Sequence, residues 1–195
     1  CILIMVKKMK SEVSINISAR HVHLTAYAHA KLFDHDLTVR NPLNQVGQFA
    51  ANETVTVKTE KGVFENVRII GPLRGYNQVE LSMTDARKLG IRPPVRKSGH
   101  LDGAEVVTIS TPKGEITESC CIIADRHVHM NPDKAKELGV VDDEVLKLHI
   151  NGEKPGVIDV KAKVSDDGYY EVHLDTDDSN AFLITPGDIG ILTKD

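Results

Sequence analysis

The sequence is poor in aromatic residues, with no tryptophan, four tyrosines and four phenylalanines among 195 residues. Stacking platforms for single-stranded nucleic acid need several exposed rings, so this class of function is not expected. A cationic excess is also missing, because 24 lysines and arginines stand against 28 acidic residues, a formal net charge of -4. Sequence-independent binding to a nucleic-acid backbone is therefore disfavoured, whereas binding of a small anionic ligand is not.

Cysteine and long apolar runs are scarce too. The cysteines are Cys1, Cys120 and Cys121, an odd number with two adjacent and none in C-x-x-C spacing. This pattern predicts neither a disulfide framework nor a zinc knuckle, and it favours Cys120 and Cys121 as small core residues in a reducing cytoplasm. The apolar opening, residues 1–6, is too short to span a bilayer or to form a complete signal peptide, so no membrane partner is expected.

Several enzyme motifs are absent as well. The sequence contains no G-x-x-x-x-G-K-[ST] and no G-x-G-x-x-G, so nucleotide phosphates are not held by those loops. It also contains no G-x-S-x-G nucleophile elbow. At 195 residues the chain can bury a sizeable core, either as one large domain or as two small ones.

What the sequence does contain is an internal duplication. The segment Ser18-Ala19-Arg20-His21-Val22-His23-Leu24 recurs as Ala124-Asp125-Arg126-His127-Val128-His129-Met130, an offset of 127 − 21 = 106 residues. A short capped helix is expected after each copy, over 25–33 and 131–138, the second with Asn131 as its N-cap, Pro132 at its first position and Gly139 ending it. The repeat predicts two similar modules facing one another. We expect a tail over 1–13, a first module over 14–119 and a second over 120–195, with strands free to exchange between modules.

The remainder has the alternation of short strands separated by turn residues. Strands are expected over 54–59, 63–70, 78–81, 106–110, 116–123, 145–150, 157–164 and 169–174, and further helices near 82–89 and 175–181. Many short strands with few short helices predict a mainly β (α+β) fold. We expect two small β-barrel modules capped by short helices, and not a doubly wound sheet.

The histidine pairs of the repeat suggest a metal centre. Side chains alternate along a strand, so His21 and His23 share one face, as do His127 and His129. Two imidazoles on one face can bind the same ion, and zinc is their usual partner. Two matched copies predict a pair of zinc ions in a shared cleft. The competing interpretation is a duplicated structural strand whose histidines only form hydrogen bonds.

Further ligands are sought on other strands. Glu80 and His173 each alternate with apolar neighbours, so both are candidates, although a polar residue on a solvated strand face is ordinary. Arg74 lies at the tip of the rigid turn Gly71-Pro72-Leu73-Arg74-Gly75 and could hold a phosphate or carboxylate through its guanidinium fork. A solvated loop arginine is the alternative. We treat the remaining histidines as ordinary residues: His29, His35, His100 and His149.

These residues resemble the propanediol-utilisation type of phosphotransacylase, the phosphate propanoyltransferases. The resemblance runs from about Ile15 to Ala181. Besides the two R-H-V-H segments it is carried by the segments 47–51, 66–74, 78–82, 84–87 and 173–177. It implies two β-barrels with two zinc ions between them. It also implies interconversion of acyl-CoA and phosphate with acyl phosphate and coenzyme A.

The resemblance also implies roles for individual residues. The implied zinc ligands are His21, His23, Glu80, His127, His129 and His173. Arg74 corresponds to the phosphate-binding catalytic arginine, and the implied coenzyme A contacts are Ser18, Lys61, Arg68 and Asn180. Implied partners are a second copy in a homodimer, acyl-CoA and phosphate. The implied location is the bacterial cytoplasm, inside a microcompartment for members with an amphipathic N-terminal extension; residues 1–12 are too short to show one.

Other functions remain open at this point. The same metal pair could activate water, which would make the chain a binuclear metallohydrolase of acyl or phosphate esters. Closed coordination shells would instead make it a zinc-stabilised structural or binding module. If it is an acyltransferase, we expect direct transfer without a covalent acyl-enzyme. The sequence does not rank acetyl, propanoyl or butanoyl as the acyl group.

Overall fold

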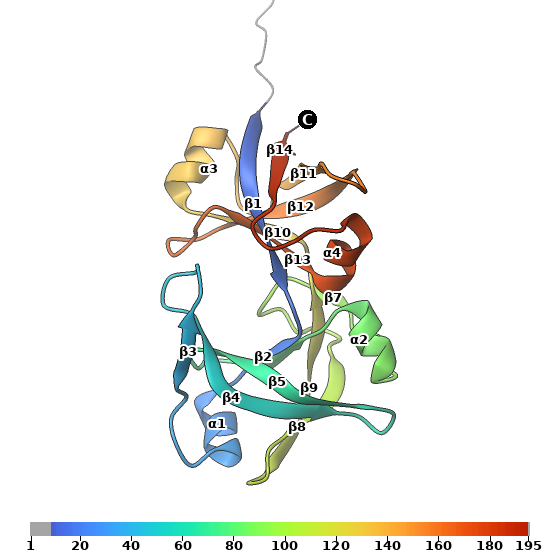
Figure 1. Ribbon diagram of the computed structural model, residues 1–195. Helices are drawn as coiled ribbons and strands as arrows, with labels where there is room; N and C mark the ends of the chain where they lie inside the picture. The colour runs from blue at the N-terminus through green and yellow to red at the C-terminus, as the bar shows by residue number, and fades with distance from the viewer. Residues whose placement is uncertain (1–8, 195) are drawn as a thin grey trace, which may run out of the picture. The chain divides into compact units, whose positions relative to one another are not determined.

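The computed structural model describes residues 9–194, which form mainly β-strands with four short helices (Figure 1). The strands are β1 Lys10–Ser18, β2 His21–His23, β3 Val39–Pro42, β4 Phe49–Lys58, β5 Val63–Gly71, β6 Gln78–Glu80, β7 Val95–Arg96, β8 Glu105–Ser110, β9 Glu115–Ala124, β10 His127–Met130, β11 Val145–Ile150, β12 Gly156–Val164, β13 Glu171–Asp175 and β14 Ile189–Thr193. The helices are α1 Ala26–Leu32, α2 Met83–Lys88, α3 Pro132–Leu138 and α4 Thr176–Phe182. Residues 1–8 of the expected tail 1–13, Cys1 among them, lie outside the described residues.

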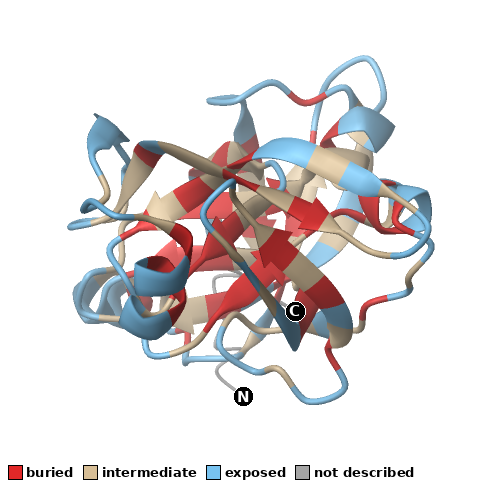
Figure 2. Ribbon diagram, turned by 90° about the horizontal axis from the view of Figure 1, so that it is seen from below, coloured by how far each residue is buried: buried red, intermediate tan, exposed pale blue. Residues whose placement is uncertain are grey.

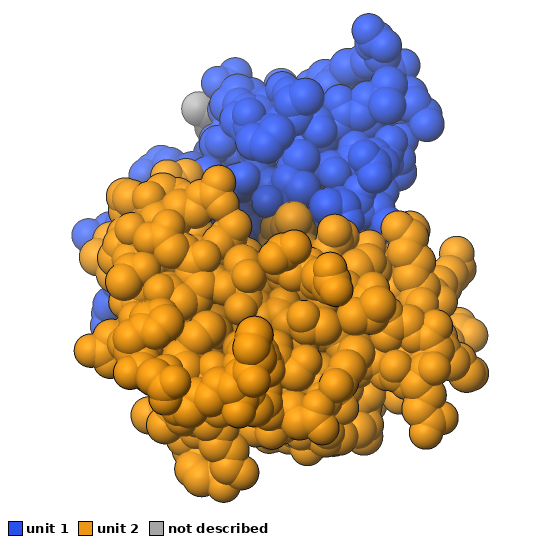
Figure 3. Space-filling model, turned by 60° about the horizontal axis from the view of Figure 1, so that its bottom comes forward, with its two compact units in different colours: residues 1–17, 126–195 blue, residues 18–125 orange. Residues whose placement is uncertain are grey.

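Tertiary contacts divide the chain into two compact units, coloured in Figure 3. Unit 1 holds residues 1–17 and 126–195, and unit 2 holds residues 18–125. The expected boundary at 119/120 lies inside β9, whose pairing with β8 along its length keeps it whole in unit 2.

Each unit contains a closed ring of strands. In unit 1 the order β1-β13-β10-β12-β11-β14 closes through the antiparallel pairing of β1 with β14. In unit 2 the order β4-β5-β2-β6-β9 closes because β8 pairs with both β4 and β9, while β3 and β7 extend the sheet. Closure leaves no open edge in either ring. The expected fold, mainly β with two small barrels and short capping helices, is confirmed.

The rings have matching connectivity but exchange one strand each. In each ring the histidine strand pairs in parallel with one neighbour, β5 or β12, and antiparallel with the other, β6 or β13. The strand that precedes each histidine strand belongs to the opposite unit: β1 leads into β2 but closes the unit 1 ring, and β9 leads into β10 but pairs within unit 2. Each barrel is therefore completed by a strand from the other half of the sequence.

Apolar side chains fill each unit separately, and Figure 2 shows the buried residues concentrated on the strands. Ile69 and Val79 are wholly buried in unit 2, as Leu148 and Val172 are in unit 1. Burying a side chain of this size stabilises the fold by roughly 1.5–3 kcal/mol. The expectation that Cys120 and Cys121 are core residues is confirmed, since both are free thiols with no exposed surface.

The helices have six or seven residues, and lengths of this kind need help at their ends. The cap residue of each helix accepts a hydrogen bond from the backbone N–H three residues further on; the caps are Thr25, Ser82, Asn131 and Asp175. The predicted start of α3 at Asn131-Pro132 and its end at Gly139, with φ of 65°, are confirmed. No helix within residues 9–194 has the length and hydropathy needed to cross a membrane.

Candidate metal centres and phosphate site

Three side chains of unit 2 meet on one face of the β2–β6 pair, and we call them the His21 triad: His21, His23 and Glu80. The antiparallel register sets His21 directly opposite Glu80. The Nε2 atoms of His21 and His23 are 3.2 Å apart. The Glu80 oxygens lie 3.5 Å from His21 Nε2 and 3.8 Å from His23 Nε2. Two nitrogens and a carboxylate therefore point at a common centre.

The backbone fixes the tautomers of both imidazoles. His21 Nδ1 lies 2.9 Å from the Ala19 carbonyl oxygen, and His23 Nδ1 lies 3.1 Å from that of Ile70. A carbonyl oxygen can only accept, so each Nδ1 carries the proton and each neutral ring turns an Nε2 lone pair toward the other. Carbonyl partners of this kind orient metal-binding histidines. When both rings are neutral, the two facing lone pairs repel unless a cation lies between them, and a proton on His21 Nε2 would remove this repulsion as a metal ion would.

The pKa values of the two imidazoles diverge. Burial is the largest single influence on His21 and opposes its charge, but the Glu80 carboxylate and the Ala19 carbonyl together outweigh it and raise the pKa of His21 above its usual value. Burial, and secondly the charge of His21, lowers the pKa of His23 to about 3. His23 is therefore neutral at physiological pH, which is the form that binds a metal.

The dimensions and donor set of the His21 triad fit zinc. Ligand atoms around a tetrahedral zinc ion, at bonds of about 2.0–2.1 Å, lie about 3.3 Å from one another. The 3.2 Å between the two Nε2 atoms and the 3.5 Å from His21 Nε2 to Glu80 Oε2 are close to this value, and His23 Nε2 lies 3.8 Å from the other carboxylate oxygen, Oε1. Three protein ligands leave a fourth position open, as in catalytic zinc sites.

A second group in unit 1 has the same construction, and we call it the His127 triad: His127, His129 and His173. Here β10 pairs antiparallel with β13, and His127 lies directly opposite His173. The Nε2 atoms of His127 and His129 are 3.1 Å apart, and one ligand atom from each of the three residues falls within 4.8 Å of the others. The donor set is three imidazoles, which also suits zinc.

Each triad has its own polar neighbours. In unit 2, Gln78 Nε2 donates to Glu80 Oε1 at 2.6 Å and to Ser98 Oγ at 2.9 Å. In unit 1, the Tyr169 hydroxyl lies 2.7 Å and Glu171 Oε1 lies 3.1 Å from His173 Nε2. Glu171 in turn accepts from Asn16 Nδ2 at 3.1 Å. The third residue of each triad is thus held by a polar residue two positions earlier on its strand.

Three of these neighbours, Gln78, Tyr169 and Glu171, belong to a second internal repeat that is not among the sequence predictions. Gly75-Tyr76-Asn77-Gln78-Val79-Glu80-Leu81 corresponds to Gly168-Tyr169-Tyr170-Glu171-Val172-His173-Leu174, an offset of 173 − 80 = 93 residues. Glycine, tyrosine, valine and leucine are identical in the two copies. The signal was present in the sequence, but its offset differs from the 106 residues of the histidine repeat, and the candidate metal-ligand position itself changes from glutamate to histidine.

Arg74 is half-buried in the loop between β5 and β6 and is held by several partners. Its guanidinium donates to the Tyr76 hydroxyl at 3.0 Å, to Gln48 Oε1 at 3.2 Å and to Ser98 Oγ at 3.5 Å. Its positive charge is near enough to lower the pKa of both His21 and His23, although burial has a larger effect on each. The loop therefore presents an anchored cation beside the His21 triad.

The residues that the resemblance connects with coenzyme A lie in both units. Arg68 is next to His21 in the parallel register of β2 and β5, and it donates to the carbonyl oxygens of Ala51 and Asn52, at 2.9 Å each. Ser18 ends β1 and is half-buried, while Lys61 is exposed in the turn between β4 and β5. Asn180 is exposed on α4 in unit 1.

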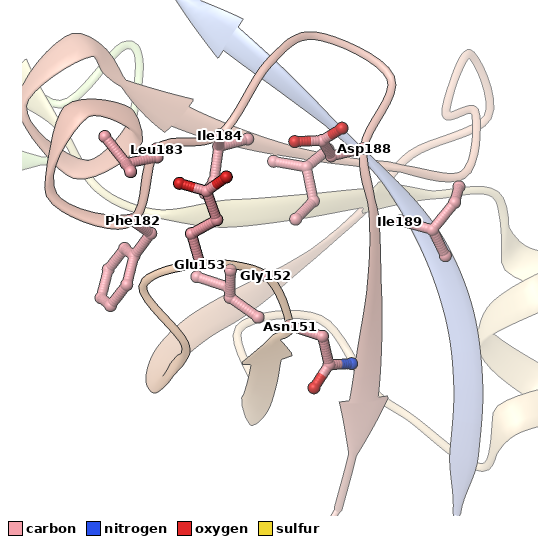
Figure 4. A pocket seen from close by; sticks show the side chains of 10 residues that line it. Asn151, Gly152, Glu153, Phe182, Leu183, Ile184, Asp188 and Ile189 are labelled. Atoms are coloured by element: carbon pink, nitrogen blue, oxygen red, sulfur yellow. The ribbon is translucent and has the colours of Figure 1, made fainter.

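A pocket in unit 1 is a separate feature (Figure 4). Phe182 and Leu183, at the end of α4, and Ile184 line it together with the carboxylates of Glu153 and Asp188. Two carboxylates repel a phosphate, so this pocket suits neither phosphate nor the phosphates of coenzyme A. Among residues 9–194, the two triads are the groups of three or more potential metal ligands. Neither triad includes the remaining histidines, His29, His35, His100 and His149.

Fold and sites together define a class: a protein of two β-barrel units, each with a histidine-containing triad on corresponding strands, β2 and β6 in unit 2 and β10 and β13 in unit 1. Comparison with known proteins then gives the family. A model of the phosphate propanoyltransferase family matches residues 14–185. Phosphate propanoyltransferases from Thermotoga maritima and Shewanella putrefaciens are 43% and 46% identical to this chain, over 91% and 90% of it and 87% and 85% of their own lengths. One from Salmonella typhimurium is 42% identical, over 87% of this chain and 82% of its own.

The chain belongs to the phosphate propanoyltransferase family, which confirms the resemblance inferred from its motifs. Membership supports a phosphate acyltransferase activity.

Proposed function

We propose that this protein transfers a short acyl group between coenzyme A and phosphate, with a zinc ion in each triad. Acyl-CoA and phosphate would give acyl phosphate and coenzyme A, and the reverse. The observation that carries the proposal, in a chain of this family, is the anchored Arg74 guanidinium beside the His21 triad. An anion site next to three metal-binding side chains suits a reaction in which phosphate attacks a polarised carbonyl.

The metals have a defined part in this proposal. Zinc held by His21, His23 and Glu80, and by His127, His129 and His173, would act as a Lewis acid toward the thioester carbonyl and the departing thiolate. Both ions would serve one reaction, so the loss of either triad would stop turnover.

Arg74 would position the attacking phosphate. Its planar fork can bind two phosphate oxygens at once, and Tyr76 and Gln48 hold the fork in place. A phosphate oxygen would form the new bond to the acyl carbon as the carbon–sulfur bond breaks. Coenzyme A would leave as the thiolate and take up a proton. Holding both reactants in one ternary complex replaces an encounter in solution by a positioned attack.

No side-chain nucleophile is required. Cys120 and Cys121 are fully buried, and burial raises the pKa of Cys120 to about 12 and raises that of Cys121 as well. Neither thiol would supply a thiolate at neutral pH. Coenzyme A would be contacted by Ser18, Lys61, Arg68 and Asn180, of which Arg68 is the strand neighbour of His21 in the β2–β5 register.

The test pairs metal analysis with product analysis. Purified protein should contain two zinc ions per chain and should release coenzyme A from propanoyl-CoA or acetyl-CoA only when phosphate is present, with acyl phosphate as the second product. Thioester cleavage without phosphate would favour a metallohydrolase. Unfolding on chelation, with no CoA-dependent activity in any state, would favour a structural zinc module. Ping-pong kinetics with a trapped acyl-enzyme would overturn direct transfer.

The proposal extends to the protein's setting, by the same resemblance. We expect a homodimer in the bacterial cytoplasm, associated with a microcompartment where the chain carries a targeting extension. Light scattering of the purified protein tests the first expectation, and co-purification with microcompartment shells from a producing bacterium tests the second.

A further inference from the structure

The arginine before each histidine pair forms an ion pair with a helix of its own unit. Arg20 Nη1 lies 3.0 Å from Asp85 Oδ2 in unit 2. In unit 1, Arg126 Nε lies 2.8 Å from Asp178 Oδ2, and Arg126 Nη2 lies 2.6 Å from Asp178 Oδ1. The metal triads do not account for these contacts, yet the contacts recur in both halves of the duplicated chain.

The two aspartates hold the same local position. Asp85 is five residues after Glu80, and Asp178 is five residues after His173. In each case the third triad residue is followed by a buried leucine and then by the helix cap, Ser82 or Asp175. The cap side chain accepts from the backbone N–H of the aspartate. The carboxylate therefore lies in the first turn of the helix, where the helix dipole favours negative charge.

Each ion pair consequently bridges the two strands that carry one triad. The arginine directly precedes β2 or β10, with its two histidines, and the aspartate belongs to the helix that directly follows β6 or β13, with the third residue. The arginine side chains are 42% and 41% exposed, but Asp85 and Asp178 are only 8% and 16% exposed. A carboxylate buried to this degree has lost much of its hydration, so removing its charged partner is costly, whereas breaking an exposed surface pair costs little.

We propose that Arg20 with Asp85, and Arg126 with Asp178, are positioning pairs that set the metal affinity of their own triad by fixing the third ligand against the two histidines. The inference rests on the proposed zinc sites. Three donors bind an ion tightly when they are held at the required spacing before it arrives. Partners one step removed from the ligands typically change metal affinity by about 10–100-fold.

The two pairs differ in a way that sharpens the test. Arg126 binds both Asp178 oxygens with its fork, whereas Arg20 contacts one Asp85 oxygen and also lies over the Phe64 ring, 4.6 Å from its centroid. A lysine ammonium can keep a single ion pair and a ring contact but cannot reproduce a two-bonded fork. A lysine should therefore preserve more of the zinc affinity of the triad at position 20 than at position 126.

The experiment measures zinc affinity by competition with a chromophoric chelator, and the Co²⁺ absorption spectrum, in the full-length variants Arg20→Met, Arg20→Lys, Arg126→Met and Arg126→Lys. His23→Ala and His129→Ala, which each disable one triad, identify which ion is which. Lys58→Met and Lys147→Met are matched controls, because each removes a cation from an exposed strand ion pair of unit 2 or unit 1. The melting temperature of each metal-free variant reports general destabilisation separately.

Arg20→Met should weaken only the His21 ion, by about 10–100-fold, and Arg126→Met only the His127 ion, each with an altered Co²⁺ spectrum. The lysine variant should recover affinity at position 20 and not at position 126, and the controls should retain both ions. Unchanged affinities, or equal weakening of both ions in every variant, would overturn the inference while leaving the proposed function intact. A wild-type protein that binds no zinc would overturn both. Zinc binding without acyl transfer would remove only the proposed function.

Discussion

The two triads show how one arrangement of strands can carry two different sets of polar side chains. Both units place a His-x-His strand antiparallel to the strand that holds the third ligand, and both hold that ligand with a polar residue two positions earlier. The types of the two residues differ between the units. Unit 2 has Gln78 followed by Glu80, whereas unit 1 has Glu171 followed by His173. Each strand therefore retains one carboxylate, as a candidate ligand in unit 2 and as the partner of a candidate ligand in unit 1.

This exchange changes the charge at each centre. A divalent ion in the His21 triad would be partly neutralised by Glu80, whereas one in the His127 triad would retain both charges among its ligands, with Glu171 beside them. The surrounding tyrosines differ in parallel: Tyr76 accepts from Arg74, while Tyr169 contacts His173. The comparison teaches that the geometry was duplicated and the electrostatics diverged. It predicts that unit 2 handles phosphate and that unit 1 supplies a stronger electrophile.

The largest effects should follow removal of one ligand from each triad. His23→Ala and His129→Ala should each leave one zinc ion per chain and should each lower kcat by about 10³-fold or more, because a Lewis acid contributes several kcal/mol to the transition state. Mass spectrometry for zinc and a CoA-release assay measure both quantities. If either variant loses its zinc ion but keeps the wild-type kcat, the two triads do not serve one reaction.

The next largest effect should be confined to unit 2. Arg74→Ala should lower kcat/KM for phosphate by about 100-fold, mainly through a higher KM for phosphate, because a two-bonded anion contact is lost. The corresponding residue of the second repeat is Asp167, so Asp167→Ala is the matched control and should change the KM for phosphate by less than about twofold. Equal phosphate kinetics in the wild type and Arg74→Ala would remove the role assigned to Arg74.

The pH dependence should reveal the unequal imidazoles of the His21 triad. Metal must displace a proton from His21, whose pKa is raised, but not from His23, whose pKa is about 3. As pH falls below the raised pKa of His21, zinc affinity should fall about tenfold per pH unit, the slope for one proton. Chelator competition in the His129→Ala variant isolates this ion. A two-proton slope would contradict the divergence of the pKa values.

The smallest effects should separate the two tyrosines. Tyr76→Phe removes one acceptor from Arg74 and should raise the KM for phosphate by about 2–10-fold, in line with one hydrogen bond of roughly 0.5–1.5 kcal/mol. Tyr169→Phe should leave the KM for phosphate unchanged and should change the zinc affinity of the His127 triad instead. Steady-state kinetics and chelator competition on both variants make the comparison, and the same response in both would argue against divided roles.

Much of the fold could be predicted from local patterns. The Asn131-Pro132 start and the Gly139 end of α3 are signals within one turn of chain, and alternation located β5 and β12 almost to the residue. The strands β1, β3, β7 and β14 were not predicted. β7 has two residues and β3 is fully exposed, so neither has an alternation of buried and exposed positions that could identify it.

Local sequence patterns predicted only some of the candidate site residues. The two-residue period of a strand indicates that His21 and His23 share a face, and likewise His127 and His129. For Glu80 and His173 the pattern alone favoured the alternative, an ordinary polar residue on a solvated strand face. Family resemblance pointed to both, and the strand register brings each of them opposite a histidine.

The sequence by itself determined the repeat, the short capped helices and the direction of the paired imidazoles, because each depends on residues a few positions apart. Only the tertiary structure decided which strands close each barrel, and therefore that β1 and β9 are exchanged between the halves. It also decided that Arg74 is an anchored cation and that Arg20 and Arg126 reach Asp85 and Asp178. These features depend on hydrogen bonds and ion pairs between residues tens of positions apart, which local periodicity does not encode.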